Sequence, residues 1–371
     1  MKPKIIIIFV ILVFCNNVKS QTSNDVLNLL IANKTVTQEQ ADSVRAEAAI
    51  KQQETDQKKK SFFMQAAKSL QISGFTHIRY QNLDEKGKID GFDVRRARID
   101  MKGSISPYWT YRLHTDFAVT PRIIDAYAEC KIADYLSIQV GQTKIPLSFE
   151  SLISPKNLEF ADWTPVVDAL TGRAKDVIGN QFGRDIGILL SGSFLKIQGR
   201  YLFEYKAGIF NGNGVNISDK NEAKDVAGRL VFFPIKGLGL GSSYYNGYAL
   251  YGSPDATNHV RNRFGFDLDY VNSDFSMRAE YLKGFDGDTE RDGWFAQAGY
   301  FLINHSFQAL FKYDTYNGDI KKTGDIQYNY SIGANYYFNT LTRLQVCYTF
   351  RDEEKTNVNN NIGTIQLQIG F

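Results

Sequence analysis

Apolar and polar side chains alternate in a long series of short segments from Leu70 to Phe371, and this pattern restricts the fold more than any other feature. Between Asp93 and Gly103 the two parities separate apolar from charged residues: Ala97, Ile99 and Met101 against Arg96, Arg98, Asp100 and Lys102. The last segment sets Ile365, Leu367 and Ile369 against Gln366 and Gln368. Successive side chains of a β-strand point to opposite faces. Each segment therefore predicts a strand with one apolar and one polar face.

The connections between these segments alternate in length. Counted from Leu70, those after even-numbered segments are tight: Ser106-Pro107, Ala133-Asp134, Pro234 to Gly237, Asn272 to Asp274, Ile303-Asn304 and Asn339-Thr340. Those after odd-numbered segments are mostly longer and polar, with an exception around Thr120-Pro121: Leu83 to Gly91, Ile145 to Gly183, Asn211 to Lys224, Tyr248 to Arg261, Phe285 to Asp292, Asn317 to Asp325 and Asp352 to Asn359.

A soluble antiparallel sheet with one wet face would show the same side-chain alternation. Short turns on one rim and long loops on the other are instead typical of outer-membrane barrels, whose short turns are periplasmic. A closed barrel can cross a membrane because it satisfies every backbone N–H and C=O group between strands. We therefore predict an all-β fold over residues 70–371, a transmembrane antiparallel β-barrel of about 16 strands. The aromatic C-terminal residue, Phe371, is typical of the last strand of such barrels.

The N-terminus has the pattern of a secretory signal. Lys2 and Lys4 precede an apolar run from Ile5 to Cys15, which is the basic and then apolar order of signal peptides. The run is shorter than the roughly 20 apolar residues that a membrane-spanning helix needs. We expect residues 1–20 to be a signal peptide. Three of the 43 Lys and Arg residues lie there, which leaves 40 against 40 Asp and Glu, so net charge does not indicate nucleic-acid binding.

Residues 21–69 do not follow the strand pattern. Thr37 and Gln40 have the spacing of a capping box, ahead of an Ala- and Glu-rich run to Gln53. The stretch Glu54 to Lys60 is polar and basic. We expect a helical extension on the periplasmic side, followed by a linker, with self-association as one role and a flexible spacer as the alternative.

The connection from Ile145 to Gly183 is much longer than the others. A loop of that length in a compact fold is usually functional, and in a barrel it can fold into the lumen and narrow it. Charges of both signs occur in it, and mixed charge at a constriction filters solutes.

Basic residues also share the polar parity of two neighbouring strands. Arginine suits phosphate because its planar fork can bond two oxygens. The predicted pore-lining, anion-binding residues of this stripe are Arg96, Arg98, Lys102 and Arg112. Arg95 has the opposite parity. The alternative is that acids on the same predicted face neutralise this stripe: Asp100, Asp116, Asp125 and Glu129.

Patterns of catalytic or metal chemistry are weak. The four histidines form no pair at helical spacing, so a metal hydrolase is not indicated. The sequence has no G-x-S-x-G motif, and Gly208 to Gly214 (GIFNGNG) precedes a polar loop and no helix. Cys130 and Cys347 lie in different predicted strands, and we expect two unpaired thiols. We predict no enzyme, no cofactor and no metal site.

Four motifs resemble one known family in order and spacing. They are Phe92 to Ile99 (FDVRRARI), Gly141 to Glu150 (GQTKIPLSFE), Gly183 to Ile188 (GRDIGI) and Gly208 to Gly212 (GIFNG). The sequence from about residue 70 to its end is similar to the phosphate-selective porin family, porins O and P. That resemblance implies a 16-stranded barrel, usually trimeric, with a basic lumen and a third loop folded inward. It also implies roles in anion binding for Arg96, Arg98 and Arg112 on the wall and for Lys144, Arg173, Lys175 and Arg184 near the constriction.

These observations lead to one function and one alternative. We expect a Gram-negative outer-membrane porin for passive diffusion of small hydrophilic solutes, with a preference for anions such as phosphate. Its partners would be outer-membrane lipid and two further copies in a homotrimer, without nucleic acid. The alternative is a plugged barrel that serves as a surface receptor or anchor, which long polar loops would suit equally well.

Overall fold

The computed structural model describes residues 30–33, 36–252, 256–303, 305–355 and 358–371. The predicted signal peptide lies outside these residues. The chain divides into two compact units, Met1–Gln65 and Ala66–Phe371, and each is considered by itself.

The N-terminal helix α2 (Gln38–Ser69) begins at the predicted capping box. The Thr37 backbone N–H donates to the Gln40 side-chain oxygen at 3.0 Å, and the Gln40 backbone N–H donates to Thr37 Oγ1 at 3.2 Å. The predicted linker at Glu54 to Lys60 is wrong, because the helix continues through it to Ser69. Glu, Gln and Lys are good helix formers, and the segment contains neither glycine nor proline. No described helix is long and apolar enough to span a membrane.

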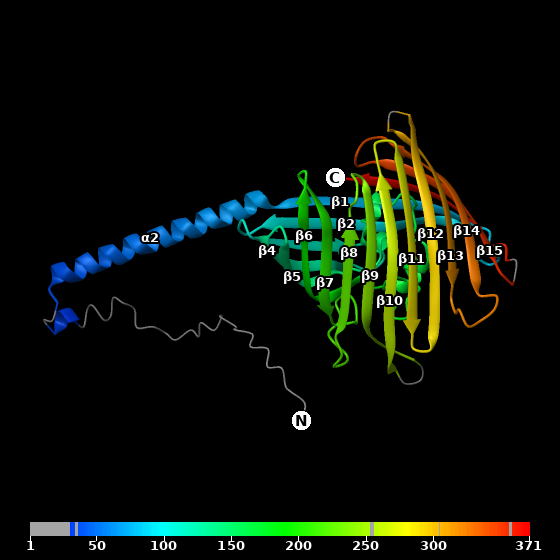
Figure 1. Ribbon diagram of the computed structural model, residues 1–371. Coiled ribbons are helices and arrows are strands. Elements are labelled where there is room, and N and C mark those ends of the chain that lie inside the picture. Colours follow the sequence, from blue (N-terminus) through cyan, green and yellow to red (C-terminus); the bar gives the residue numbers. More distant parts are fainter. Residues whose placement is uncertain (1–29, 34–35, 253–255, 304, 356–357) are drawn as a thin grey trace, which may run out of the picture. The chain divides into compact units, whose positions relative to one another are not determined.

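The second unit is a barrel whose sixteen described strands each pair with the next, and β1 closes onto β16 (Figure 1). All pairs are antiparallel, which confirms the predicted fold. The strands are β1 (Gln71–Leu83), β2 (Gly91–Ser104), β3 (Trp109–Asp116), β4 (Arg122–Ala133), β5 (Leu136–Lys144), β6 (Arg184–Ile197), β7 (Arg200–Phe210), β8 (Asp225–Phe232), β9 (Leu238–Tyr251), β10 (Thr257–Val271), β11 (Phe275–Asp286), β12 (Thr289–Ile303), β13 (Phe307–Asn317), β14 (Ile326–Tyr337), β15 (Arg343–Glu353) and β16 (Ile362–Gly370).

The barrel is apolar outside and polar inside. On β16, Ile365 is 47 % exposed and the next residue, Gln366, is 1 % exposed. Gln366 donates a hydrogen bond to Gln345 of β15 at 2.7 Å. Apolar residues on the outer face meet lipid at no cost, whereas inward polar groups need partners when they are buried. The alternation read from the sequence is therefore the lipid-to-lumen alternation of a membrane barrel.

Two of the predicted long loops are much shorter in the structure. The strands β9 and β10 remain paired as far as Tyr251 and Thr257, and β11 and β12 as far as Asp286 and Thr289. The expected loops at 248–261 and 285–292 are therefore wrong. Strands this long extend past an apolar band about 25 Å tall. The first residues of β10 and β12, Thr257 to His259 and Thr289 to Asp292, are polar on both faces and resemble a loop in sequence.

A β-bulge in β2 changes the predicted orientation of Arg95. The register against β1 passes from His77–Arg96 to Ile78–Val94, which leaves Arg95 as the extra residue. The Nε of Arg95 lies 3.5 Å from a carboxylate oxygen of Asp162 in the loop between β5 and β6. The prediction that Arg95 points away from the lumen-facing charges is wrong, because an inserted residue breaks the period of two.

Candidate functional site

The loop between β5 and β6, residues 145–183, is called the third loop below. It contains α3 (Phe149–Leu152), the 3-10 turn η1 (Pro155–Asn157) and α4 (Pro165–Leu170). Val166, Val167 and Leu170 of α4 form one apolar cluster with Leu282, Phe295 and Tyr316, which belong to β11, β12 and β13. The third loop thus lies inside the barrel, against a wall far away in sequence.

Opposite charges hold the two ends of α3. The backbone N–H groups of Phe149 and Glu150 donate to the Glu280 carboxylate at 2.9 and 3.0 Å. At the other end, Lys144 Nζ donates to the carbonyl oxygens of residues 151, 152 and 153 at 3.3, 2.7 and 3.1 Å. A carboxylate at the N-terminus and an ammonium group at the C-terminus both complement the free backbone groups of a helix.

Glu150 and Glu159 hold the middle of the third loop. Glu150 accepts hydrogen bonds from the backbone N–H and Oγ1 of Thr164 at 3.0 and 2.7 Å. Glu159 accepts from three inward side chains, Ser276, Gln297 and Gln308, at 2.5, 2.6 and 2.8 Å. It also forms an ion pair with Arg278 at 3.1 Å. The hydrogen bonds of Glu159 thus tie the third loop to β11, β12 and β13.

Asp176 fixes the second half of the third loop to β10. It accepts two hydrogen bonds from Arg261, Nε at 3.1 Å and Nη2 at 2.8 Å. Arg263 lies 3.8 Å away and forms a closer pair with Asp286 at 2.6 Å. Both arginines are fully buried. The sequence interpretation missed them because it placed Arg261 at the end of a loop; their spacing of two was the available signal.

Four of the predicted basic residues are ion-paired along β2, β3 and β6. Arg98 pairs with Asp116 at 2.7 Å, Arg112 with Asp100 at 2.8 Å and Arg184 with Asp125 at 2.7 Å. Lys102 is half-exposed and lies 3.3 Å from Asp100. Acids on the lumen face thus compensate much of the stripe. Glu129 forms no ion pair with the residues that the structure describes.

Arg96 is buried and, within the described chain, has no carboxylate within ion-pair distance. Its Nη1 lies 3.2 Å from Nδ1 of His77. Arginine can only donate, so Nδ1 accepts and the ring carries its proton on Nε2. That nitrogen then donates to Gln368 at 2.9 Å. The contact adds no negative charge beside Arg96.

Arg173 lies between the third loop and the wall. Its guanidinium carbon is 3.7 Å from the centre of the Trp163 ring, and Nη2 donates to O and Oγ of Ser151 at 3.1 and 3.0 Å. The buried Arg173 Nε and Arg98 Nη1 have no hydrogen-bond partner among the described residues.

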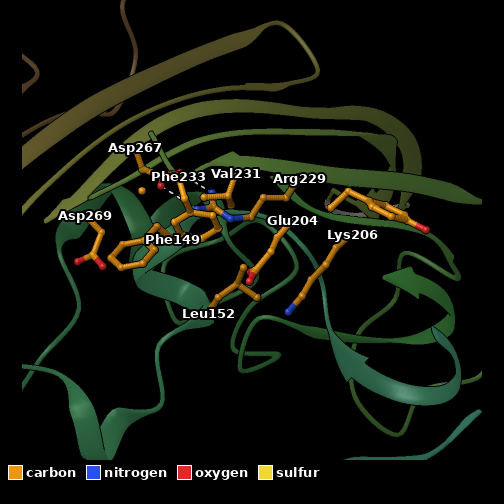
Figure 2. A pocket seen from close by; sticks show the side chains of 11 residues that line it. Phe149, Leu152, Glu204, Lys206, Arg229, Val231, Phe233, Asp267 and Asp269 are labelled. Carbon is orange, nitrogen blue, oxygen red and sulfur yellow. Dashed lines mark hydrogen bonds and ion pairs between the residues drawn. The ribbon is translucent and has the colours of Figure 1, made fainter. Parts of the chain in front are cut away.

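Five of the predicted residues lie near one another at the base of the third loop, where their positive charges repel each other. We call them the basic cluster: Arg96, Arg98, Lys144, Arg173 and Arg184. Lys102 and Arg112 lie on neighbouring positions of β2 and β3, outside this cluster. Lys175 lines a separate cavity beside the third loop. A further lumen cavity, next to α3, is shown in Figure 2, where Arg229 extends toward Phe149 and Asp267, and Glu204 and Lys206 lie on the next strand.

No group of three or more His, Cys, Asp or Glu side chains in the described ranges is placed to hold a metal ion. Cys130 and Cys347 are free thiols, as predicted.

A closed barrel with an apolar exterior, a polar interior and a long loop folded into its lumen defines a porin, a channel protein of the Gram-negative outer membrane. A model of the family described as phosphate-selective porin O and P matches residues 70–249 and 252–371. The chain belongs to this family, as its motifs predicted.

Solved porin structures share the fold. An anion-selective porin from Comamonas acidovorans has a TM-score of 0.62 at 11 % identity, over 82 % of this chain and 99 % of that one. The OmpF porin of Salmonella typhi in complex with daunomycin has a TM-score of 0.60 at 14 % identity, over 81 % and 97 %. The in-vitro folded trimer form of Vibrio cholerae OmpT has a TM-score of 0.56 at 11 % identity, over 82 % and 99 %. No curated protein matches the chain.

Proposed function

We propose that this porin lets small hydrophilic solutes diffuse passively and prefers anions such as phosphate. The observation that carries the proposal is the basic cluster, where Arg96, Lys144 and Arg173 have no carboxylate within ion-pair distance in the described chain. Two buried guanidinium nitrogens there, Arg98 Nη1 and Arg173 Nε, have no hydrogen-bond partner among the residues that the structure describes. Cations that no nearby carboxylate compensates make the local potential positive, and this potential would favour oxyanions that pass the third loop.

The test is the reversal potential of the purified protein in a planar bilayer under a KCl gradient, followed by added phosphate. We expect a chloride-favouring potential and a conductance that low phosphate reduces. Replacing Arg96 and Arg98 together by Ala should move the potential toward cation selectivity. The single variant Arg96→Gln is easier to interpret, because removing this guanidinium takes no ion-pair partner away from any carboxylate among the described residues.

The matched control removes one charge of each sign. Arg112→Gln combined with Asp100→Asn deletes an ion pair of the same wall and should leave the potential unchanged. Equal shifts in Arg96→Gln and in this control would contradict the role of the basic cluster. A folded barrel without any conductance would favour the plugged receptor or anchor, an alternative that the many contacts of the third loop with the wall make worth testing.

We also propose the remaining organisation of the chain. Residues 1–20 would be removed on export, and residues 21–69 would lie in the periplasm before the barrel at 70–371. One structurally similar outer-membrane protein is described as a trimer form, and we propose a homotrimer in outer-membrane lipid. Crosslinking of the membrane-embedded protein should stop at three subunits, and a product confined to the monomer would contradict this assembly.

A further inference from the structure

The polar cavity that Lys175 lines, of about 200 Å³, lies between the third loop and the inner wall of β13 to β16. None of the basic cluster's five residues lines it. The charged groups that line this cavity are therefore different from those of the proposed anion site.

The wall of this cavity carries two inward cations on adjacent rows of the sheet. Lys312 of β13 pairs in register with Ser331 of β14, which pairs with Thr349 of β15. The next row places Asp314, Asn329 and Arg351 side by side. The hydroxyl groups of Ser331 and Thr349 thus follow Lys312 along its row. On the next row, Asp314 and Asn329 lie between Lys312 and Arg351.

Lys312 is only 5 % exposed, yet it lines the cavity. Its Nζ lies 4.7 Å from the centre of the Phe160 ring, and it forms no hydrogen bond or ion pair within the described part of the chain. Arg351 likewise has no ion pair there. Buried ammonium groups are normally paired, so this one is free to receive an anionic group of a ligand.

The third loop presents acids on the opposite side. Asp168 of α4 lines the cavity and forms no ion pair with the described residues. Asp162 pairs with Arg79 at 3.1 Å and Arg95 at 3.5 Å. The lining thus interleaves three acids, Asp162, Asp168 and Asp314, with four cations, Arg95, Lys175, Lys312 and Arg351. Mixed charges of this kind suit a molecule that carries both signs better than a small dianion.

Apolar surface completes the cavity. Phe160 and Trp163 from the third loop and Ile362 from β16 all line it. Sites for small molecules combine such apolar walls with a few convergent polar groups. An apolar side chain on the solute would bury against these residues.

We propose that this cavity is a binding site for small zwitterions, namely free amino acids with apolar side chains. The carboxylate would bind Lys312 and Arg351, the ammonium group would bind Asp168, and the side chain would pack against Phe160 and Trp163. This site adds a class of solute to the proposed anion preference. It rests on the porin fold alone and does not depend on the basic cluster.

Three probes of matched shape test the charge requirement: L-phenylalanine, 3-phenylpropionate and phenethylamine. Each is added to single channels in a bilayer, and the concentration that halves the current is measured. Phenylalanine should act at a concentration about tenfold lower than either singly charged analogue. Equal block by phenylpropionate would show a simple anion site, and equal block by phenethylamine a simple cation site; either result overturns the proposal.

Two variants assign the effect to this cavity. Lys312→Met and Asp168→Asn should each raise the half-blocking concentration of phenylalanine about tenfold. The matched control is Lys206→Met, which removes a lysine from the other lumen cavity (Figure 2) and should leave phenylalanine block unchanged. Heat-modifiable mobility on gels and conductance in KCl verify folding of each variant. A folded Lys312→Met channel that phenylalanine still blocks normally would refute the site.

Discussion

Asp176 should control how firmly the second half of the third loop is held against the wall. Its carboxylate accepts two hydrogen bonds from the fully buried Arg261, at 3.1 and 2.8 Å. Asp176→Asn keeps the size of the side chain and removes its charge. Arg263 keeps its own partner, Asp286, whereas Arg261 is left buried without a carboxylate within ion-pair distance among the described residues.

The free-energy cost of Asp176→Asn follows from the burial of Arg261. Removing one partner of a buried ion pair costs about 3–5 kcal/mol. Arg261 also contacts the Tyr245 ring, at 4.7 Å from its centre, which offsets part of the loss, so we take the lower limit of about 3 kcal/mol. Since each 1.4 kcal/mol is about a tenfold change, the open state of residues 171–183 should become roughly 100-fold more populated.

Amide hydrogen exchange followed by mass spectrometry measures this opening. Exchange of the 171–183 backbone should accelerate about 100-fold in Asp176→Asn, because the exchange rate follows the population of the locally open state. Single-channel recordings of the same variant should show larger current fluctuations, since the loop lies in the lumen.

The matched control is Asp162→Asn in the first half of the same loop. Its side chain is 40 % exposed, its partner Arg95 is 38 % exposed, and its other partner Arg79 keeps an ion pair with Asp93. The loss should therefore be close to the value for exposed pairs, about 0–1 kcal/mol. Exchange of residues 171–183 should change less than about tenfold in this control. If Asp176→Asn also stayed within that limit, burial would not set the strength of the Asp176 contact, and the reasoning would be refuted.

Three further predictions concern α3, the barrel wall and pH. Glu280→Gln weakens the acceptor for the N–H groups of Phe149 and Glu150, and should destabilise the docked α3 by about 1–3 kcal/mol, seen as faster amide exchange there than in Asp269→Asn. Gly141→Val should abolish the heat-modifiable barrel on gels, because Gly141 has φ +129° and a Cβ would lie 2.3 Å from the Ala126 oxygen, whereas Gly91→Val meets nothing within 4 Å and should fold. Burial raises the pKa of Asp168, with Lys175 opposing the shift, so protonation on acidification should weaken phenylalanine block at a higher pH than an ordinary aspartate would, and Asp168→Asn should remove this pH dependence.

The barrel could be predicted because its determinants are local in the sequence. Side-chain parity and connection length each depend on a few neighbouring residues, and together they gave sixteen strands. The wrong predictions for the strands fall where side chains no longer alternate between an apolar and a polar face. Arg95 lies in a bulge, and β10 and β12 begin with residues that are polar on both faces.

The interior of the site could not be predicted in the same way. Its contacts join residues far apart in the chain, such as Glu159 with Gln308 and Asp176 with Arg261. The polar parity marked these residues as facing the lumen, but parity does not show which acid meets which base. Lys312 was missed for this reason, since only the position of the third loop shows that it lacks a partner.

The proposed ion preference depends on which charges of the lumen are paired and not on how many there are. The sequence outside the predicted signal has as many acids as bases, which alone would indicate no preference between ions. The ion pairs Arg98–Asp116 and Arg184–Asp125 cancel locally. Lys144 instead donates to backbone carbonyls, and Arg173 packs on Trp163. Those contacts place no carboxylate beside Lys144 or Arg173, so the proposed anion preference is compatible with equal numbers of acids and bases outside the predicted signal.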